Sequence, residues 1–302
     1  MPWMKRGLVI VPGGQAPWVG SHAALPVVQA LGDGRERVFF CSRDTGNRSH
    51  IGYATLAPDG HVAPGGFSST PVLSPGALGA FDDAGVTTSC LVEHGGRLFL
   101  YYTGWALGVS VPFYLHTGLA VSDDGGTTFR RVSAAPLLDR IDVDPYLNAS
   151  PWVLVEQGVW RMWYVSGTGW DAAVGGARHR YHIKYAESRD GLRWQRDGHV
   201  CLDYAGPGEH AFGRPCVVRD GDVYRMWFSS RGAAYRLGYA ESRDGLVWTR
   251  RDEAAGVAPS PNGWDSEMVT YPAVTRIAGG WRMLYNGNGY GRTGIGAAEL
   301  TA

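Results

Sequence analysis

The chain has 302 residues, and its 28 basic side chains balance 28 acidic ones. A net charge of zero gives no reason to expect nucleic acid or a membrane surface as a partner, since both select basic patches. The first apolar run, residues 8–11, is too short for the core of a signal peptide, and no later stretch is long enough to cross a bilayer. We expect a cytoplasmic protein with a small-molecule substrate, and both a monomer and a homo-oligomer stay open.

The first expected element is a strand over residues 6–11, which has no partner of its own nearby. Five copies of a three-part pattern follow it. Each copy has a short apolar strand, then an aromatic strand after a Gly or Asp turn, and then a strand that ends in small residues. The apolar strands are expected at 26–28, 89–92, 151–153, 215–218 and 272–274. The aromatic strands are expected at 37–41, 97–102, 160–164, 224–228 and 281–285, and the third strands at 51–54, 118–120, 183–186, 237–240 and 295–298.

An Asp-Gly turn followed by a bulky aromatic residue closes the three middle copies, at 122–129, 188–194 and 242–248. Glycine takes the positive φ that a tight turn demands, so Asp-Gly between strand patterns predicts a hairpin to a fourth strand. Copies that lie 54 to 66 residues apart fit one four-stranded blade each. No segment keeps an apolar helical period over the length of a helix, so helix should be almost absent.

These patterns predict an all-β chain with one domain, a five-bladed β-propeller over residues 1–302. The blades are expected at roughly 26–62, 86–132, 151–200, 215–250 and 272–300. The last copy stops after its third strand, at 299–302, and a closed ring leaves no free sheet edge. We therefore expect the N-terminal strand 6–11 to pair in the last blade as its outer strand, which would close the ring.

The four cysteines, Cys41, Cys90, Cys201 and Cys216, form no Cys-x-x-Cys pair, and three of them fall inside expected strands. Buried, reduced thiols are typical of a cytoplasmic protein, and we favour this interpretation over a disulfide or a metal site. The sequence contains no phosphate-binding loop, dinucleotide fingerprint or zinc-binding helix motif. We expect no metal and no cofactor, although a cation in the central channel stays open.

The Ser-x-Asp-Gly-x-x-Trp turns at 188–194 and 242–248, together with the Arg-Met-Trp strands at 161–163 and 225–227, resemble the five-bladed glycoside hydrolases. That superfamily includes families 43, 32, 68, 62, 117 and 130. The resemblance spans about residues 26–300, and it implies an enzyme that cleaves or transfers a glycosidic bond. It also implies three carboxylates, in the order Asp, Asp and Glu, directly before the inner strands of successive blades.

The chain departs from this pattern at the starts of its inner strands. The residues that stand there are Leu25, Ser150, Arg214 and Tyr271, and none is a carboxylate. Acids lie a few residues earlier, in the connectors that lead into those strands. We predict Glu209 as the general acid and Asp144 or Asp83 as the base or orienting carboxylate, with Glu267 as a fourth catalytic candidate. The alternative is that these carboxylates hydrogen-bond neighbouring connectors and hold the blades together.

Topology predicts which end of the propeller holds the site. In an antiparallel blade, the connector into the inner strand and the loop between the second and third strands lie at one end. The Asp-Gly turns lie at the other end, so their aspartates are expected to be structural turn residues: Asp124, Asp190 and Asp244. Loops held by a rigid scaffold commonly carry binding residues. The substrate-binding residues that we predict are His22, Arg43, Asp44, Trp105, Trp170, His210, Arg214, Arg231, Tyr271 and Arg292.

The arginines among these residues favour an anionic substrate such as a uronic acid, a sugar phosphate or a nucleotide sugar. Arginine binds carboxylate or phosphate through a rigid two-pronged fork. The alternative is a set of salt bridges between blades. Our leading hypothesis is a glycoside hydrolase-like enzyme that uses carboxylate acid/base chemistry. Two alternatives stay open: a cyclase, isomerase or lyase of a biosynthetic pathway on the same scaffold, and a sugar-binding propeller without catalysis.

Overall fold

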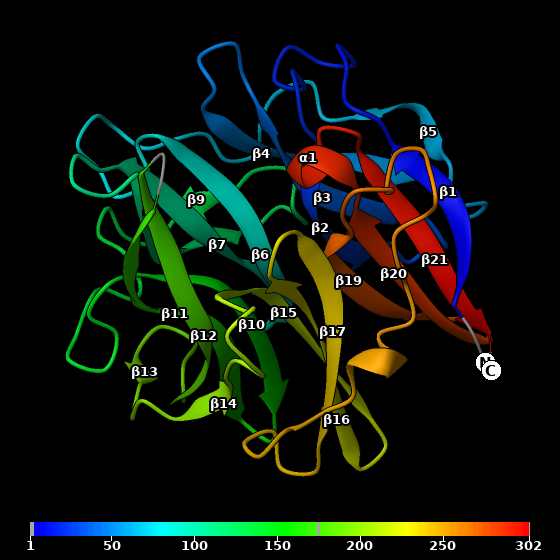
Figure 1. Cartoon of the computed structure of the whole chain (residues 1–302). Helices are drawn as coiled ribbons and strands as arrows, with labels where there is room; N and C mark the ends of the chain where they lie inside the picture. The colour runs from blue at the N-terminus through cyan, green and yellow to red at the C-terminus, as the bar shows by residue number, and fades with distance from the viewer. Residues whose placement is uncertain (1–2, 174–175, 302) are drawn as a thin grey trace.

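The computed structural model describes residues 3–173 and 176–301, and nearly all of its regular structure is β-strand (Figure 1). Over those ranges, helix is limited to a 3-10 turn at Asp252–Ala254 and the short α1 at Asn288–Gly291. The all-β class predicted from the sequence is confirmed. Neither described helix is long and apolar enough to span a membrane.

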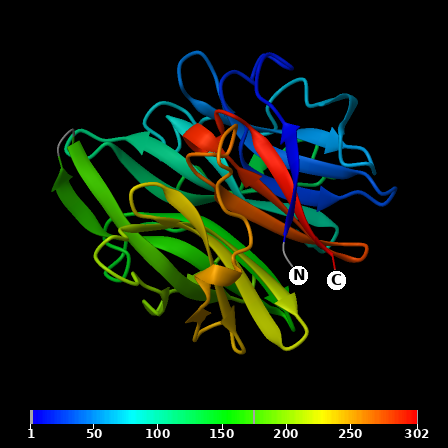
Figure 2. The same cartoon turned by 45° about the vertical axis from the view of Figure 1, so that its right-hand side comes forward.

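The strands form three sheets of four, nine and eight strands. The antiparallel pairings divide them into five successive units, and single parallel pairs join β4 to β6 and β12 to β15. Figures 1 and 2 show how the strands are arranged in space. The first unit holds β2 (Ala24–Ala30), β3 (Glu36–Arg43), β4 (Ser49–Leu56) and β5 (Val62–Phe67). The second holds β6 (Gly85–His94), β7 (Arg97–Leu107), β8 (Phe113–Ser122) and β9 (Arg130–Arg131). The third holds β10 (Asn148–Glu156), β11 (Val159–Ala173), β12 (Gly176–Ser188), β13 (Trp194–Gln195) and β14 (Val200–Leu202). The fourth holds β15 (Ala211–Asp220), β16 (Val223–Arg231), β17 (Tyr235–Ser242) and β18 (Thr249–Arg250).

The fifth unit joins the two ends of the chain. It holds β19 (Thr270–Ile277), β20 (Gly280–Asn286) and β21 (Ile295–Thr301), with β1 (Met4–Ile10) as its outer strand. β1 runs antiparallel to β21, with Met4 opposite Glu299 and Ile10 opposite Ile295. The blue and red strands lie side by side in both ribbon views (Figures 1 and 2). The N-terminal strand therefore pairs where the sequence predicts, although it begins two residues before residue 6.

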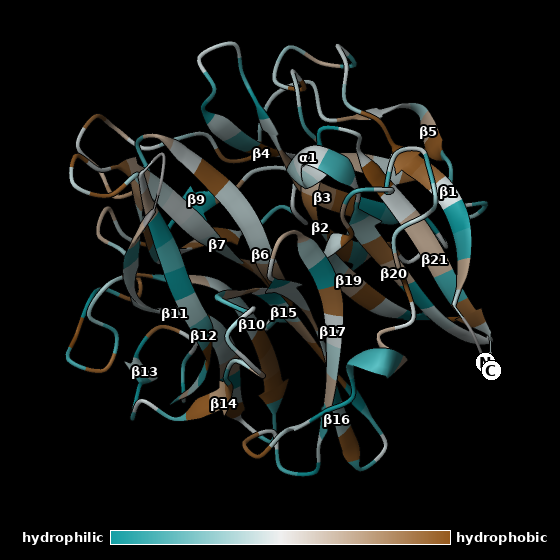
Figure 3. Ribbon diagram, viewed as in Figure 1, coloured by the Kyte–Doolittle hydropathy of each residue, from teal (hydrophilic) through white to brown (hydrophobic). Residues whose placement is uncertain are grey.

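The aromatic second strands pack between neighbouring units and hydrogen-bond the Asp-Gly turns. Strand segments range from brown and apolar, as in β3, to teal and polar, as in part of β12 (Figure 3). The Tyr101 hydroxyl donates to the carbonyl of Gly191 at 2.9 Å, and the Trp163 indole donates to the carbonyl of Gly245 at 2.8 Å. Within the turns, Asp190 and Asp244 accept backbone N–H groups of the following residues. The predicted structural role of the turn aspartates is confirmed, because their oxygens are used inside the turns.

All four cysteines are free and buried, as the sequence predicts. Cys90 and Cys216 lie on the inner strands β6 and β15. The thiol of Cys90 accepts the N–H of Val153 at 3.3 Å, and the thiol of Cys216 accepts the N–H of Val274 at 3.2 Å. Each contact links one inner strand to the next antiparallel unit along the chain.

Each inner strand begins with a β-bulge, and four of the five bulges carry a residue with a left-handed backbone. The register of the strand pair shifts at this point in all five units. The φ angles are 54° at Leu25, 47° at Ser150, 47° at Arg214 and 56° at Tyr271. Such a conformation costs a residue other than glycine roughly 1 to 3 kcal/mol, so surrounding contacts must hold it.

Side chains of an adjacent unit supply those contacts at three of the bulges. The N–H of Leu25 donates to Oδ1 of Asn286, that of Ser150 to Oγ1 of Thr103, and that of Tyr271 to Oγ of Ser229, each at 2.8 Å. Asn286 is fully buried, and its Nδ2 also donates to the carbonyls of Ala23 and Gly294. This one side chain thus links the fifth unit to the first.

Replacing Asn286 by alanine should destabilise the protein by about 3 kcal/mol, because the change leaves several buried backbone groups without partners. Urea denaturation followed by tryptophan fluorescence measures the loss. The exposed Gln195→Ala is the matched control and should change stability by less than about 0.5 kcal/mol. Equal stabilities for the two variants would contradict a role for Asn286 in joining the two units.

Candidate functional site

A cavity of about 400 Å³ opens where the inner strands begin. Leu25, Ser150, Gly213 and Tyr271 line it from the strand starts. The loops between second and third strands contribute the rest of the lining, largely through aromatic and basic side chains. Over residues 3–173 and 176–301, no aspartate or glutamate lines the cavity. The cavity therefore lies at the end of the units to which topology assigns the site, and the four predicted catalytic carboxylates are not in its lining.

One wall of the cavity is a cluster of aromatic and basic groups from β12, β16 and β17. The His179 ring stacks on Tyr181 with 4.6 Å between centroids, and the Tyr181 hydroxyl lies 3.2 Å from that of Tyr235. The Arg231 guanidinium lies over the Tyr235 ring at 5.3 Å and near the Tyr290 ring at 5.9 Å. Arg231 forms no ion pair with any carboxylate in the described part of the chain. A half-buried, unpaired guanidinium facing a cavity is suited to bind an anion.

His22 and Arg43 line the cavity as well, from the first unit. Nδ1 of His22 lies 2.7 Å from the Ser21 hydroxyl, and Arg43 donates to Oδ1 of Asn47 at 3.1 Å. Burial, together with the positive charges of Arg43 and Arg292, lowers the pKa of His22 to about 4. His22 is therefore neutral at neutral pH, and the arginines carry the positive charge of the site.

The pKa of His179 is lowered to about 4 by burial and by the positive charges of Arg231, His210 and Arg178. Its Nε2 is shielded from solvent and has no hydrogen-bond partner among the described residues, which leaves Nδ1 as the nitrogen that can meet a ligand. A neutral imidazole with a free lone pair is a proton acceptor. The site thus contains a group able to take a proton at neutral pH.

Half of the predicted substrate-binding residues line the cavity. These are His22, Arg43, Trp105, Arg231 and Tyr271. Of the others, Asp44 pairs with His50 at 3.0 Å, and Trp170 packs edge-on against the Phe113 ring at 5.2 Å. His210 lies behind His179, with 6.2 Å between the rings. Arg292 is exposed near His22, outside the lining.

Arg214 is fully buried and does not line the cavity. One of its nitrogens donates to the carbonyl of Pro26 in the first unit. Its Nε and Nη1 have no hydrogen-bond partner among the described residues. Burial lowers the pKa of the guanidinium to about 10, so the group stays charged at neutral pH. Arg214 thus places a fixed charge in the interior of the molecule.

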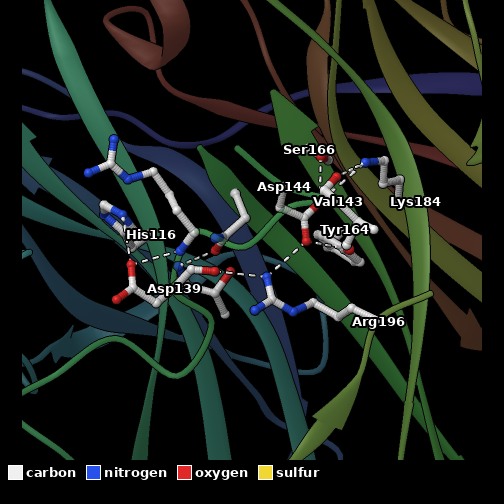
Figure 4. Close-up of polar contacts among 11 residues, drawn as sticks. His116, Asp139, Val143, Asp144, Tyr164, Ser166, Lys184 and Arg196 are labelled. Carbon is white, nitrogen blue, oxygen red and sulfur yellow. Dashed lines mark hydrogen bonds and ion pairs between the residues drawn. The ribbon is translucent and has the colours of Figure 1, made fainter. Parts of the chain in front are cut away.

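Among the predicted catalytic carboxylates, Asp144 is completely buried and is not part of the cavity lining. It lies in the polar network that Figure 4 shows. It accepts the Tyr164 hydroxyl at 2.9 Å, the Ser166 hydroxyl at 2.6 Å and Nη1 of Arg196 at 2.8 Å. Lys184 lies 3.4 Å from its other face. These groups occupy both carboxylate oxygens, so little capacity remains for a substrate.

Glu209 forms a two-pronged ion pair with Arg250 at 2.8 and 2.9 Å. It also accepts the N–H of Ala205 at 2.7 Å and the hydroxyl of Ser230. Asp83 accepts the N–H of Gly79 at 2.9 Å, while Glu267 is exposed. The structure brings none of the four predicted carboxylates into the cavity and does not bring them to one point.

The buried aspartates of the connectors share one set of contacts, which we call a brace: each aspartate lies between a tyrosine hydroxyl and a cation. Three aspartates each accept a hydroxyl from the tyrosine 20 residues further along the chain, at 2.9 to 3.0 Å. The pairs are Asp82 with Tyr102, Asp144 with Tyr164, and Asp265 with Tyr285. A cation then neutralises each aspartate at 2.6 to 2.8 Å, namely Arg131, Arg196 and Lys5. Glu209 and Arg250 occupy the corresponding place in the fourth unit. The contacts match the structural alternative that the sequence left open.

Several cavity residues were not among the predicted site residues. They are His179, Tyr181, Tyr235 and Tyr290. All four belong to loops or strand ends that topology assigns to the site end. The sequence signal that could have identified them is the concentration of histidine, arginine and tyrosine in those segments. The prediction instead chose carboxylates as the catalytic residues.

Solved structures with a similar fold include glycoside hydrolases. The protein BT0996, described in an RGII complex, aligns with a TM-score of 0.79 and 20% identity, over 99% of this chain and 92% of that protein. A thermostable family-43 glycoside hydrolase aligns with a TM-score of 0.64 and 16% identity, over 93% and 88%. The Bombyx mori GH32 beta-fructofuranosidase BmSUC1 aligns with a TM-score of 0.61 and 15% identity, over 93% and 62%. The chain therefore has the fold of the propeller glycoside hydrolases, as the sequence resemblance implied.

Closer similarity is found to two proteins of Mycobacterium tuberculosis. Uncharacterized protein MT1551, from strain CDC 1551, and uncharacterized protein Rv1502, from strain H37Rv, are each 43% identical to this chain. In both cases the similarity covers 99% of this chain and 99% of the relative. No family model matches the sequence. The chain is a member of one protein family with MT1551 and Rv1502.

Replacing Glu209 by glutamine tests its role. Partial burial raises the pKa of Glu209, but hydrogen bonds from Arg250, Ala205 and Ser230 outweigh it and lower the pKa from 4.5 to about 2. Its contribution to stability is therefore complete above pH 4.5 and is lost as the pH falls through 2. We expect Glu209→Gln to lose roughly 2 kcal/mol at neutral pH and to show a weaker loss of stability in acid.

Urea denaturation at neutral pH and at about pH 3 measures both effects. The exposed Glu253→Gln, which removes the same charge outside any described ion pair, is the control. A Glu209→Gln variant with unchanged stability and no turnover would instead support the catalytic role predicted from the sequence.

Proposed function

We propose that this chain is an enzyme that cleaves or transfers a glycosidic bond of a small anionic sugar bound in the cavity. The observation that carries this proposal is the lining itself. Aromatic rings offer faces for a sugar, while Arg43 and Arg231 line the same space without carboxylate partners among the described residues. Concave sites that combine apolar walls with a few polar groups are typical of small-molecule binding.

The fold neighbours support a sugar as the substrate. One of them is described in an RGII complex, and the Bombyx mori beta-fructofuranosidase is described in complex with sucrose. Their sequence identity to this chain is low, so they support the type of fold and do not identify a particular sugar. The cavity of this chain adds the evidence for a charged ligand, since Arg43 and Arg231 form no ion pair with any carboxylate that the structure describes.

The propeller architecture is part of the same proposal. We assign one blade to each antiparallel unit, which gives five blades in one domain over residues 1–302. The inner strands β2, β6, β10, β15 and β19 contact one another in sequence, and β19 also contacts β2. This cyclic set of contacts and the pairing of β1 with β21 support a ring closed by the N-terminal strand. The four free thiols support the predicted cytoplasmic location.

A catalytic role for Glu209, Asp144, Asp83 and Glu267 stays a prediction from the sequence. Asp144 and Glu209 are occupied by ion pairs, and all four lie outside the cavity lining. We therefore base the binding proposal on the cavity residues alone. Hydrolysis, transfer and other routes of bond cleavage are all compatible with that binding mode.

Replacing Arg231 by glutamine should weaken binding of an anionic sugar about 10-fold to 100-fold, because one charge-assisted hydrogen bond is lost. Calorimetry with glucuronate, glucose phosphate and glucose measures this effect. The wild-type protein should bind one or both anions more tightly than glucose, and the preference should shrink at high salt.

The matched control is Arg130→Gln, which removes an exposed arginine on β9, away from the cavity. It should leave all three affinities unchanged. Equal binding of glucose and of both anions by the wild-type protein would contradict an anionic substrate.

A further inference from the structure

The cavity raises a chemical question about bond cleavage. Glycoside hydrolysis ordinarily uses two carboxyl groups, one as acid and the other as base or nucleophile. Over the described residues, no carboxylate lines the cavity. Its titratable lining consists of histidine, tyrosine and arginine side chains and the Cys41 thiol. Of these, histidine and tyrosine are suited to serve as the base and the acid of a cleavage reaction.

His179 is placed to accept a proton. It lines the cavity, and stacking on Tyr181 fixes the plane of its ring. Because Nε2 is enclosed, Nδ1 is the nitrogen open to a ligand. The charged and titratable groups that act on this ring are Arg231, His210 and Arg178. Together with burial they keep the imidazole neutral at neutral pH, so its lone pair is available.

Arg231 and Tyr271 complete the arrangement. Both contact the Tyr235 ring, Arg231 at 5.3 Å and Tyr271 with 6.1 Å between ring centroids. The Tyr181 and Tyr235 hydroxyls pair with each other, whereas no described group hydrogen-bonds the Tyr271 hydroxyl. The left-handed bulge holds Tyr271 at the start of β19, where it lines the cavity. A free hydroxyl, an unpaired guanidinium and a neutral imidazole thus meet in one space.

We propose that the cavity cleaves the sugar linked to O4 of a uronate residue by β-elimination, with His179 as the base, Arg231 on the substrate carboxylate and Tyr271 as the proton donor. This inference rests on the proposed function and names its substrate class and reaction. Elimination needs a proton next to a carboxylate and a sugar oxygen as leaving group on the neighbouring carbon. Neutral hexoses lack that carboxylate and are not substrates.

The step balances without an added reactant. Nδ1 of His179 takes the proton from the carbon that bears the carboxylate, and the electron pair of that C–H bond forms a C=C bond to the neighbouring ring carbon. The C–O bond from this second carbon to the leaving sugar breaks. The leaving oxygen takes the Tyr271 hydroxyl proton, and a proton from imidazolium restores the tyrosine through solvent. Arg231 stabilises the negative charge that builds up on the carboxylate.

The test uses purified full-length protein with oligogalacturonates, heparin-type uronates and alginate oligosaccharides, each beside its carboxyl-reduced form. Elimination produces a conjugated uronate that absorbs in the ultraviolet, and mass spectrometry finds no added water. We expect this product from a uronate and none from the reduced partner. The rate should rise with pH through about 4, where His179 loses its proton.

His179→Ala and Tyr271→Phe should each reduce turnover about 100-fold or more. Both should still bind the uronate, whereas Arg231→Gln should raise KM and also lower kcat, because Arg231 binds the carboxylate and stabilises the charge that builds up on it. His61→Ala, which removes an exposed histidine on the first unit, is the control and should keep full activity.

Saturated products that contain added water would overturn the elimination and leave the proposed function intact. Binding of uronates without cleavage of any of them would also overturn it. If the protein neither binds nor cleaves any sugar in the set, the proposed function fails together with this inference. Full activity of His179→Ala would remove the histidine from the reaction even if unsaturated product forms.

Discussion

The strained starts of the inner strands are the constraint on which both the fold and the site depend. Leu25, Ser150 and Tyr271 hold left-handed conformations because a side chain of an adjacent unit binds each of their N–H groups. The same three residues line the cavity. The shape of the cavity therefore depends on how the units pack against one another. A shift between units would break these hydrogen bonds and allow the left-handed residues to relax.

The braces in the connectors also stabilise the positions of the strands around the cavity. A buried aspartate between a tyrosine hydroxyl and a cation fixes the connector against its own second strand. Removing a single partner would leave an uncompensated charge in the interior, which is far more costly than losing a surface pair. The acids are thus bound where the connectors need rigidity, and the cavity beside them is left to neutral and cationic groups.

The sequence was informative about the strands because their signals are local. Alternation, aromatic runs and Asp-Gly turns are set by nearby residues, and the strand over 6–11 could be placed by counting partners. The side-chain directions of Asp144 and Glu209 could not be predicted in this way. Residues in a connector do not alternate with a fixed period, so their order does not indicate which side chains point to the cavity and which to the interior. The recurring spacing of 20 residues between Asp82 and Tyr102, and in two further pairs, was a usable signal for bracing. This spacing becomes visible in the sequence only when the position of each aspartate is compared with that of the tyrosine in the second strand that follows it.

The charge of the cavity follows from these placements. The buried connector aspartates bind the cations of the braces, and Arg43 and Arg231 have no carboxylate partner among the described residues. The charge of Arg43 therefore lowers the pKa of His22, and that of Arg231 lowers the pKa of His179. Arginine keeps its proton at neutral pH. The cavity thus has permanent positive charge and neutral imidazoles, which favours entry of an anion. In the proposed elimination, a carboxylate bound at Arg231 would offset that charge and make His179 a stronger base, so that one guanidinium would couple binding to proton transfer.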